Sequence, residues 1–410
     1  MTRTQEAIMS PMSIVLLLTL LMGIQPVTTD LYLPALPTIS QALGASTGAT
    51  QLTLSVLIIC FGIAQLVCGP LADRFGRRPV LLVGMALYAV ASVLSAFAPS
   101  IEWLILWRAL QGAAMAAAVT CGRSIVRDLF PPHQGARVMS HALTGLGFIA
   151  TMSPIVGGLA VQWIDWHASL LMLALYSAAT LAFIAWRFEE TVPQRNPLAL
   201  QPATLWRNWR AVLADPTFRA WTALSSLTFA GLFVYLAGSS FVFIGVLGVS
   251  RASYGLLVAT NSIAYIGGTL VCRRLLATHG LRRTSRVGGV FTLAGGLLLA
   301  GFALAGVRNP WVIVMPMWLY AIGHGIHQPC GQTGAIGPFP DKAGAAAAMS
   351  GFMMTLGAFV AGLWLGHSND GTVYPLTLGI AAIAVVTTTV AWTLVQRHGE
   401  PASAAHTQPA

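Results

Sequence analysis

The chain has 410 residues, of which 56% are hydrophobic and only 8% are charged. Soluble domains carry about 25% charged residues, so this composition excludes a single water-soluble globule. The net charge of +10 could suggest a nucleic-acid partner, but the basic residues fall in short segments between apolar runs. The sequence therefore predicts an integral membrane protein.

The first apolar run follows a single arginine and resembles a signal peptide in composition. No small-residue cleavage site follows it, so it is interpreted as an uncleaved first span. The five cysteines lie in or at the ends of apolar runs and show no Cys-x-x-Cys spacing. No disulfide framework, metal site or cofactor is therefore expected.

Twelve apolar segments are predicted to form the transmembrane helices of an all-α membrane protein, because each approaches the length that spans a bilayer. In chain order they are residues 13–33, 50–69, 80–98, 103–124, 137–161, 168–187, 220–245, 253–272, 286–306, 311–331, 343–366 and 373–395. The longest polar interval, residues 188–219, is predicted to link an N-terminal six-helix bundle (1–187) to a C-terminal one (220–398). Residues 399–410 are predicted to form a disordered tail.

The basic residues are distributed unevenly between the predicted loops. With a cytoplasmic N-terminus, 19 of the 22 lie in cytoplasmic segments, while Arg251 and Arg308 lie outside and Arg108 lies within a span. Cytoplasmic loops of membrane proteins are enriched in Lys and Arg. Both termini are therefore predicted to face the cytoplasm.

An internal repeat supports two related halves. Residues 71–78 (LADRFGRR) and 276–283 (LATHGLRR) are 205 positions apart, match at four of eight positions, and follow the second and eighth predicted spans. Chance similarity in a chain rich in Leu, Ala and Arg is the alternative. Two pseudo-symmetric halves with a site at their interface are a transporter design.

The segment at 69–78, GPLADRFGRR, combines turn-forming residues with an acidic side chain. Asp73 can reach Arg77 or a helix N-terminus; a plain cytoplasmic basic loop would explain the arginines but not Asp73. The segment resembles the signature loop of the major facilitator superfamily (MFS), whose acidic residue latches the two halves in the outward-facing state. The resemblance implies a conformational latch that contains Gly69, Asp73, Arg74, Gly76, Arg77 and Arg78.

Arg108 falls inside the fourth predicted span, where a charge is costly unless it faces a polar cavity or a partner. An arginine that extends to the outer membrane surface is the alternative. The spacing places Arg108, Gln111 and Gly112 on one helical face. The segment resembles the fourth-helix motif of the MFS, in which the arginine is linked to proton transfer.

Asp30 is the only acidic residue inside the first apolar run. A medium of low dielectric constant favours the neutral form of a carboxyl group, so Asp30 could exchange a proton against a substrate. An exposed carboxylate at a helix end is the alternative. The segment 30–37, DLYLPALP, closely resembles the D-[ML]-Y-L-P-A-[LV]-P run of the Bcr/CflA drug exporters, which implies proton coupling by Asp30 and Arg108 in a bacterial inner membrane.

The end of the fourth span, residues 123–130 (RSIVRDLF), resembles the R-x-[IV]-[VI]-R-D ending of the same family. The MFS resemblance implies that Asp128 joins Asp73 and Arg77 in a charge relay. Arg123 lies deeper than Arg127 and is a candidate for the cavity wall. A basic cap at the inner membrane surface is the alternative for both arginines.

The fifth span contains Ser153, Pro154, Gly157 and Gly158. Proline bends a helix and glycines permit close helix packing. The segment resembles part of the antiporter motif G-x-x-x-G-P-x-x-G-G, with Ser153 before the proline and Ile149 at the first glycine position. Export is expected from this motif together with the Bcr/CflA resemblance.

Other polar and aromatic residues in the spans are candidates for the wall of an amphiphilic cavity, and helix packing is the alternative for each. His324 and His327 share one helical face, but a metal site would need ligands that the sequence does not provide. The candidates are Tyr32, Phe61, Gln65, Gln111, Arg123, His141, Tyr235, Asn261, Tyr265, Trp318, His324 and His327.

These features predict a proton-coupled exporter of a small amphiphilic drug or metabolite that works by alternating access. The MFS resemblance implies a monomer that is driven by the proton gradient. An MFS proton symporter, or an exporter of a small metabolite, is the alternative. An enzyme is not expected, because the spans contain no HExxH, GxSxG or paired-carboxylate motif.

Overall fold

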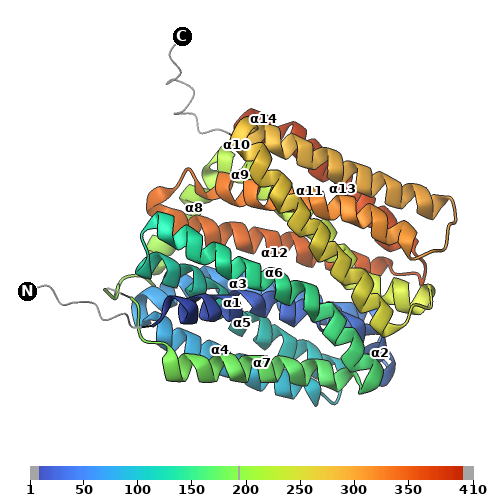
Figure 1. Ribbon diagram of the computed structural model, residues 1–410, viewed down its shortest axis with the longest axis horizontal. Helices are drawn as coiled ribbons and strands as arrows, with labels where there is room; N and C mark the ends of the chain where they lie inside the picture. The colour runs from blue at the N-terminus through green and yellow to red at the C-terminus, as the bar shows by residue number, and fades with distance from the viewer. Residues whose placement is uncertain (1–8, 193, 400–410) are drawn as a thin grey trace, which may run out of the picture.

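The computed structural model describes residues 9–192 and 194–399, and these residues form helices and turns without a strand. The helices run side by side along the long axis of the molecule (Figure 1). Both ends of the described chain lie at one end of this axis, here named the termini end; the opposite end is named the far end. The predicted all-α fold is confirmed, whereas all but Gly399 of the predicted tail lies outside the described residues.

The first part of the chain forms six long helices and two short ones. They are α1 (Pro11–Asp30), η1 (Leu33–Ala35), α2 (Leu36–Ala42), α3 (Thr47–Phe75), α4 (Arg77–Ala96), α5 (Ile101–Leu129), α6 (Pro132–Trp163) and α7 (Trp166–Arg187).

The second part begins with a short helix in the linker and contains five further long helical segments. They are α8 (Pro202–Ala214), α9 (Pro216–Ser240), η2 (Phe241–Val246), α10 (Arg251–Leu304), α11 (Trp311–Ile336), η3 (Pro340–Lys342), α12 (Ala343–Ser368), α13 (Tyr374–Trp392) and α14 (Leu394–His398).

Ten helices among the described residues are long and apolar enough to cross a membrane. α10 supplies two crossings, because its 54 residues are far longer than a bilayer is thick and Gly280 breaks it with a φ of 68°. α11 has 26 residues, and its polar His324, His327 and Gln328 lower its hydropathy. The twelve predicted crossings are accounted for in this way.

Three predicted boundaries differ from the structure. The first span ends at Asp30 rather than residue 33, because prolines follow at positions 34 and 37 and the chain continues through η1 and α2. The segments 253–272 and 286–306 are two helices, as predicted, but both extend to the break at Gly280, so that no loop separates them. The predicted linker 188–219 contains the helix α8.

The helices pack in two groups. In the first, α1 packs against α5, α6 and α7, and α4 packs against α5 and α7; in the second, α9 packs against α11, α12 and α13, and α10 packs against α11 and α13. The groups join mainly through two helix pairs, α3 with α12 and α6 with α10 (Figure 1). The molecule therefore has an interface between its N-terminal and C-terminal groups, along which a site can form.

Candidate functional site

At the far end, the two groups of helices approach each other at backbone distance through glycines of α6 and α10. A Cβ atom on Gly158 would lie 2.4 Å from the carbonyl oxygen of Arg251, and one on Gly255 would lie 2.2 Å from that of Pro154. A Cβ on Gly157 would lie 2.2 Å from the carbonyl oxygen of Leu31, just beyond α1. Only glycine permits these contacts, so the predicted antiporter segment packs against both groups.

Polar contacts accompany this closure of the far end. Arg251 Nε donates to Thr38 Oγ1 at 3.1 Å, and the backbone N–H of Ala252 donates to Gln162 Oε1 at 3.0 Å. Within α6 itself, Ser153 Oγ donates to the carbonyl of Ile149 at 2.8 Å. The far end is therefore closed by backbone packing and by hydrogen bonds between the two groups.

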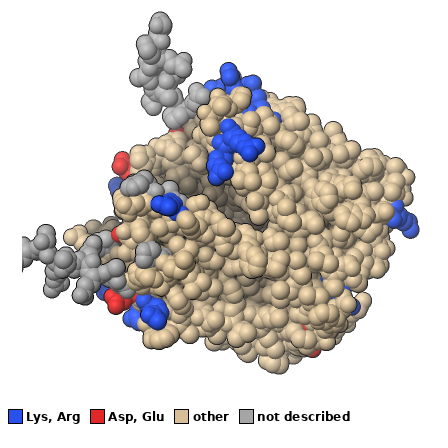
Figure 2. All heavy atoms as spheres, in the orientation of Figure 1, with Lys and Arg blue, Asp and Glu red and all other residues tan. Residues whose placement is uncertain are grey.

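The other interface pair, α3 and α12, packs through small residues. Cβ atoms on Gly62 and Gly362 would lie 1.8 Å from Thr355 Oγ1 and 2.4 Å from Ser55 Oγ, respectively. In the view of Figure 2 the surface is hollowed between the two groups, on the side of the termini end. The molecule is thus closed at the far end and open toward the termini end.

Asp30 is the last residue of α1 and lies beside this interface. Its carboxylate is half-buried and accepts a hydrogen bond from Thr29 Oγ1 at 2.7 Å. It has no ion-pair partner among the described residues. The short helix η1, which begins three residues after Asp30, contacts α9 and α10 of the other helix group. The structure thus places an unpaired carboxylate between the two groups.

Arg108 is fully buried inside the N-terminal group. Its Nη1 donates to Gln111 Oε1 at 2.5 Å, and its Nη2 donates to the carbonyl of Thr28, in the last turn of α1, at 3.2 Å. The guanidinium lies over the Tyr32 ring, 4.1 Å from its centroid. An arginine that extends to the membrane surface is therefore excluded. The guanidinium has no carboxylate partner in the described chain and stabilises the carbonyl end of α1 instead.

Two further hydrogen bonds fix the end of α1. Thr28 Oγ1 and Tyr88 Oη lie 2.5 Å apart, and Tyr32 Oη and Thr53 Oγ1 lie 2.9 Å apart. Tyr88 was missed by the sequence analysis, although it is a polar side chain in the middle of an apolar run. The end of α1 that carries Asp30 is held by side chains from α3, α4 and α5.

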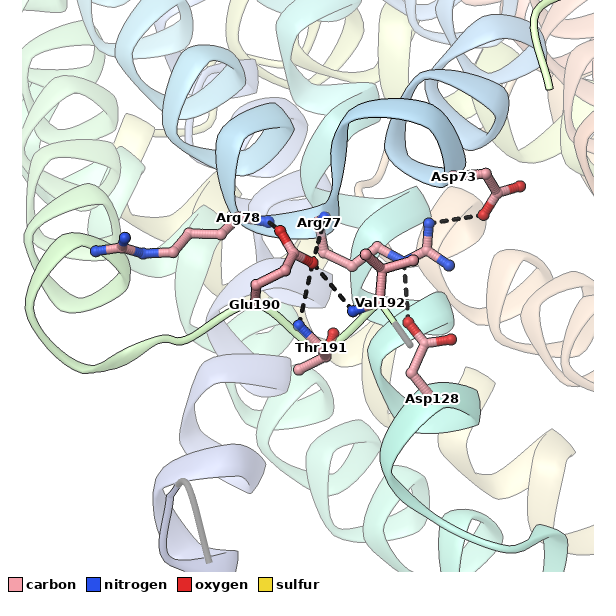
Figure 3. Close-up of polar contacts among 7 residues, drawn as sticks. All are labelled: Asp73, Arg77, Arg78, Asp128, Glu190, Thr191 and Val192. Atoms are coloured by element: carbon pink, nitrogen blue, oxygen red, sulfur yellow. Dashed lines mark hydrogen bonds and ion pairs between the residues drawn. The ribbon is translucent and has the colours of Figure 1, made fainter. Parts of the chain in front are cut away.

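At the termini end, Arg77 lies between two carboxylates (Figure 3). Arg77 Nη1 pairs with Asp73 Oδ1 at 2.6 Å, and Arg77 Nε pairs with Asp128 Oδ2 at 2.9 Å. The structure thus brings together the three residues of the predicted relay. Of the neighbouring arginines, Arg74 stacks on the Phe75 ring and Arg78 Nη2 donates to the carbonyl of Ala185. Gly69 is in ordinary contact with α5.

A third carboxylate, Glu190, joins this cluster and was missed by the sequence analysis. It accepts hydrogen bonds from the backbone N–H groups of Arg77 and Arg78 at 2.8 and 3.1 Å, at the start of α4 (Figure 3). It also accepts from two N–H groups of its own segment. A negative charge at a helix N-terminus is stabilising. A Cβ on Gly76 would lie 2.2 Å from Glu190 Oε2, so Gly76 makes room for this cap.

All ion pairs of the cluster formed by Asp73, Arg77, Asp128 and Glu190 belong to the N-terminal group and the linker. Asp73 bonds the linker as well, because its carbonyl accepts from the N–H of Asn196 at 2.9 Å. Among the described residues the Asp73 side chain pairs with Arg77 alone. The latch between the two halves that the MFS resemblance implies is therefore not formed in this conformation.

Several of the predicted cavity residues lie near the interface between the groups. Gln65 lies close to Gly351 of α12, and Tyr32 and Gln111 surround Arg108. Arg123 and His141 are exposed. Phe61, Tyr235 and Asn261 are buried.

The remaining predicted cavity residues contact helices of the C-terminal group. Trp318 Nε1 donates to Thr260 Oγ1 at 2.8 Å, and His327 Nε2 lies 3.1 Å from the carbonyl of Ser285, so both side chains face α10. The ring centroids of Tyr265 and His324 lie 5.5 Å apart. Trp318 and His327 therefore pack between helices. No group of three or more possible metal ligands occurs in the described parts of the chain.

Comparison with known proteins gives a consistent result. Residues 18–362 match the model of the Major Facilitator Superfamily. The chain is 30% identical to a chloramphenicol resistance protein of Pseudomonas aeruginosa, over 78% of this chain and 75% of the relative. It is 27% identical to multidrug resistance protein D of Escherichia coli, over 85% and 87% of the two chains. It is 25% identical to a bicyclomycin resistance protein homolog of Haemophilus influenzae, over 94% and 96%.

The fold is similar to that of solved transporter structures. The crystal structure of a D-xylose-proton symporter superposes with a TM-score of 0.73, covers 95% of this chain and 99% of the symporter, and shares 15% sequence identity. At that identity the likeness concerns the fold alone.

Proposed function

Because this chain belongs to the major facilitator superfamily of membrane transporters, we propose that it exports small amphiphilic toxic compounds in exchange for protons. The relatives named for resistance to chloramphenicol, bicyclomycin or several drugs support this class of substrate. The proposal concerns a monomer in a bacterial inner membrane. The basic residues concentrated in the predicted cytoplasmic segments support an orientation with both termini in the cytoplasm.

The main support for this proposal is the carboxylate of Asp30, which lies between the two helix groups and has no ion-pair partner among the described residues. A medium of low dielectric constant favours the neutral form of a carboxyl group, whereas contact with water favours the ionised form. A change in the surroundings of Asp30 can therefore make it bind or release a proton. We assign proton exchange to Asp30. Substrate that enters from the termini end would favour loss of the proton, and proton entry from the far end would favour release of the substrate.

Arg108 is a positioning residue in this scheme. Its guanidinium binds the carbonyl of Thr28, two residues before Asp30, and stacks on Tyr32, two residues after it. Arg108 therefore fixes the chain on both sides of Asp30, and a change in the charge of Asp30 affects this fixed segment. We propose that residues 1–187 and 220–398 move as two bodies, and that the cluster of Asp73, Arg77, Asp128 and Glu190 sets the balance between their orientations.

Drug susceptibility of an exporter-deficient host tests this function. The intact chain is expected to raise resistance to at least one amphiphilic antibiotic, whereas an equally expressed Asp30→Asn variant leaves susceptibility at the level of the empty host. Equal resistance with both proteins would remove Asp30 from the mechanism. If neither protein changes susceptibility to any compound, toxic amphiphiles are the wrong class of substrate.

The direction of transport is tested separately in inverted membrane vesicles. An exporter with this orientation accumulates substrate inside inverted vesicles when their interior is acidified, because protons then leave as substrate enters. A proton symporter would instead lose substrate from the vesicles under the same gradient.

A further inference from the structure

The second copy of the repeat, residues 276–283, lies at a position in the C-terminal group that corresponds to the position of residues 71–78 in the N-terminal group. The two copies differ in their charged residues. Residues 276–283 lie at the kink of α10, where Gly280 has a φ of 68°, comparable to Gly76 with a φ of 106° between α3 and α4. Thr278 stands where the first repeat has Asp73. The second repeat therefore keeps its arginines without the acidic residue that pairs with them in the first.

Basic side chains at this end of the C-terminal group form an exposed surface, here named the basic surface. Among the described residues none of its members has an ion-pair partner. Between positions 216 and 399 the only acidic residues are Asp341 and Asp370, and Asp370 lies at the far end, between α12 and α13. The members of the basic surface are Arg273, Arg274, Arg283, Arg286 and Arg397.

The kink and α14 are tied together beneath this surface. Arg282 Nη2 donates to the carbonyl of Gln396, and Gln396 Nε2 donates to the carbonyl of Arg282 at 2.9 Å. Trp392 Nε1 donates to the carbonyl of Arg286 at 3.1 Å. The exposed side chains of Arg286 and Arg397 thus belong to one rigid corner of the fold. Figure 2 shows Lys and Arg side chains gathered at this corner.

Large apolar side chains adjoin the same corner. The side chains of Trp392 and Leu394 are 45% and 44% exposed, on a helix end that turns from α13 into α14. A tryptophan beside arginines is typical of the depth at which headgroups meet acyl chains. The corner therefore offers positive charge next to an apolar surface.

We propose that the basic surface binds the headgroup of an anionic phospholipid, with its phosphate against Arg283 and Arg286 and its acyl chains along Trp392 and Leu394. Phosphate suits arginine, because the guanidinium donates two parallel hydrogen bonds to it. Basic pockets beside membrane-spanning helices bind anionic lipids for this reason. The bound lipid supplies the negative charge that Asp73, Asp128 and Glu190 supply in the N-terminal group.

Thermal stability of the purified full-length protein in an uncharged detergent tests this proposal. Phosphatidylglycerol or cardiolipin is expected to raise the melting temperature, whereas phosphatidylcholine is not. The double variant R283Q/R286Q is expected to bind the anionic lipid about 25-fold more weakly, since each basic residue near an anionic surface contributes about a fivefold factor. R283K/R286K, which keeps both charges, is expected to retain most of the response.

The matched control is R207Q/R210Q, which removes the same charge from exposed positions of α8. This control is expected to respond to anionic lipid like the parent protein. An equal loss of response in both double variants would show general electrostatic attraction and overturn the proposal. A rise produced equally by inorganic phosphate would also overturn it. If R283Q/R286Q is unstable without lipid, the single variant R397Q is measured in its place. An unchanged lipid affinity of R397Q would then contradict the proposal.

Discussion

Two sets of charges in the N-terminal group have opposite surroundings. At the termini end, Arg77 has two carboxylate partners and Glu190 accepts four backbone hydrogen bonds. Near the far end, Asp30 and Arg108 have no ion-pair partner in the described chain. The charged groups at the termini end therefore have ionic or backbone partners, whereas Asp30 and Arg108 near the far end have no partner of opposite charge among the residues that the structure describes.

This difference separates structural charges from functional ones. An unpaired charge inside a membrane protein is costly and is kept where the function uses it. Arg108 is fully buried yet bonds only neutral groups, whereas Asp30 stays half-buried at the interface. The account therefore predicts that changes at the unpaired charges affect coupling, and that changes at the paired cluster affect stability and the balance of conformations.

The largest effect is expected from Asp30→Asn. The amide keeps the size of the side chain but cannot exchange a proton, so uphill drug transport in proteoliposomes should fall to the level seen without a proton gradient. Exchange of labelled for unlabelled drug, which needs no net proton movement, should persist. Loss of exchange as well would mean that Asp30 serves binding or folding rather than coupling.

Arg108→Gln is expected to have the next largest effect. The shorter amide leaves the carbonyl of Thr28 without its donor, and a buried polar group without a partner costs about 1–3 kcal/mol. Melting temperature should fall, and the pH dependence of transport should shift because the end of α1, which carries Asp30, loses the hydrogen bond that Arg108 donates to Thr28. Arg127→Gln, at an exposed position near the end of the same helix, is the control and should leave both quantities near those of the parent.

Gly158→Ala tests the closure of the far end. Its methyl group would lie 2.4 Å from the Arg251 carbonyl oxygen on the other helix group, and such overpacking costs about 1–3 kcal/mol. The population should shift toward a conformation that is open at the far end, seen as a longer distance between spin labels at Gln41 and Asn309. Gly147→Ala adds the same methyl group on α6 at an ordinary contact distance of 3.5 Å and should not lengthen that distance.

The smallest effect is expected from Glu190→Gln, which removes the charge at the N-terminus of α4 but keeps one acceptor oxygen. A favourable charge at a helix end is worth about 0.3–1 kcal/mol, so a modest drop in melting temperature is predicted. Asp165→Asn weakens the comparable cap of α7, where Asp165 Oδ1 accepts from the N–H of Ala168. Only Glu190→Gln should also change the transport rate. If Glu190→Gln and Asp165→Asn transport at equal rates, Glu190 acts only as a helix cap.

Much of the fold follows from the sequence, because each crossing is a long apolar run with charges at its ends. The pairing of Asp73 with Arg77 is likewise local, since residues four apart share a helical face. The end of α1 was less clear, because its composition stays apolar through the break that follows Asp30.

The remaining features depend on contacts between distant segments. Glu190 binds the amide of Arg77, 113 positions earlier, through backbone groups that carry no sequence signal. Trp318 and His327 make polar contacts with Thr260 and Ser285 of α10 that their positions in the sequence did not predict. Helical periodicity places residues on a face, but the neighbour of that face is set by tertiary packing.

The most direct test of the central claim is proton release when substrate binds. Purified protein in a weakly buffered detergent solution is mixed with a drug that it exports, and the pH change is followed with an indicator dye. The account predicts that the parent protein releases protons on binding and that Asp30→Asn binds the drug without releasing them. Equal proton release from both proteins at equal drug binding would contradict it.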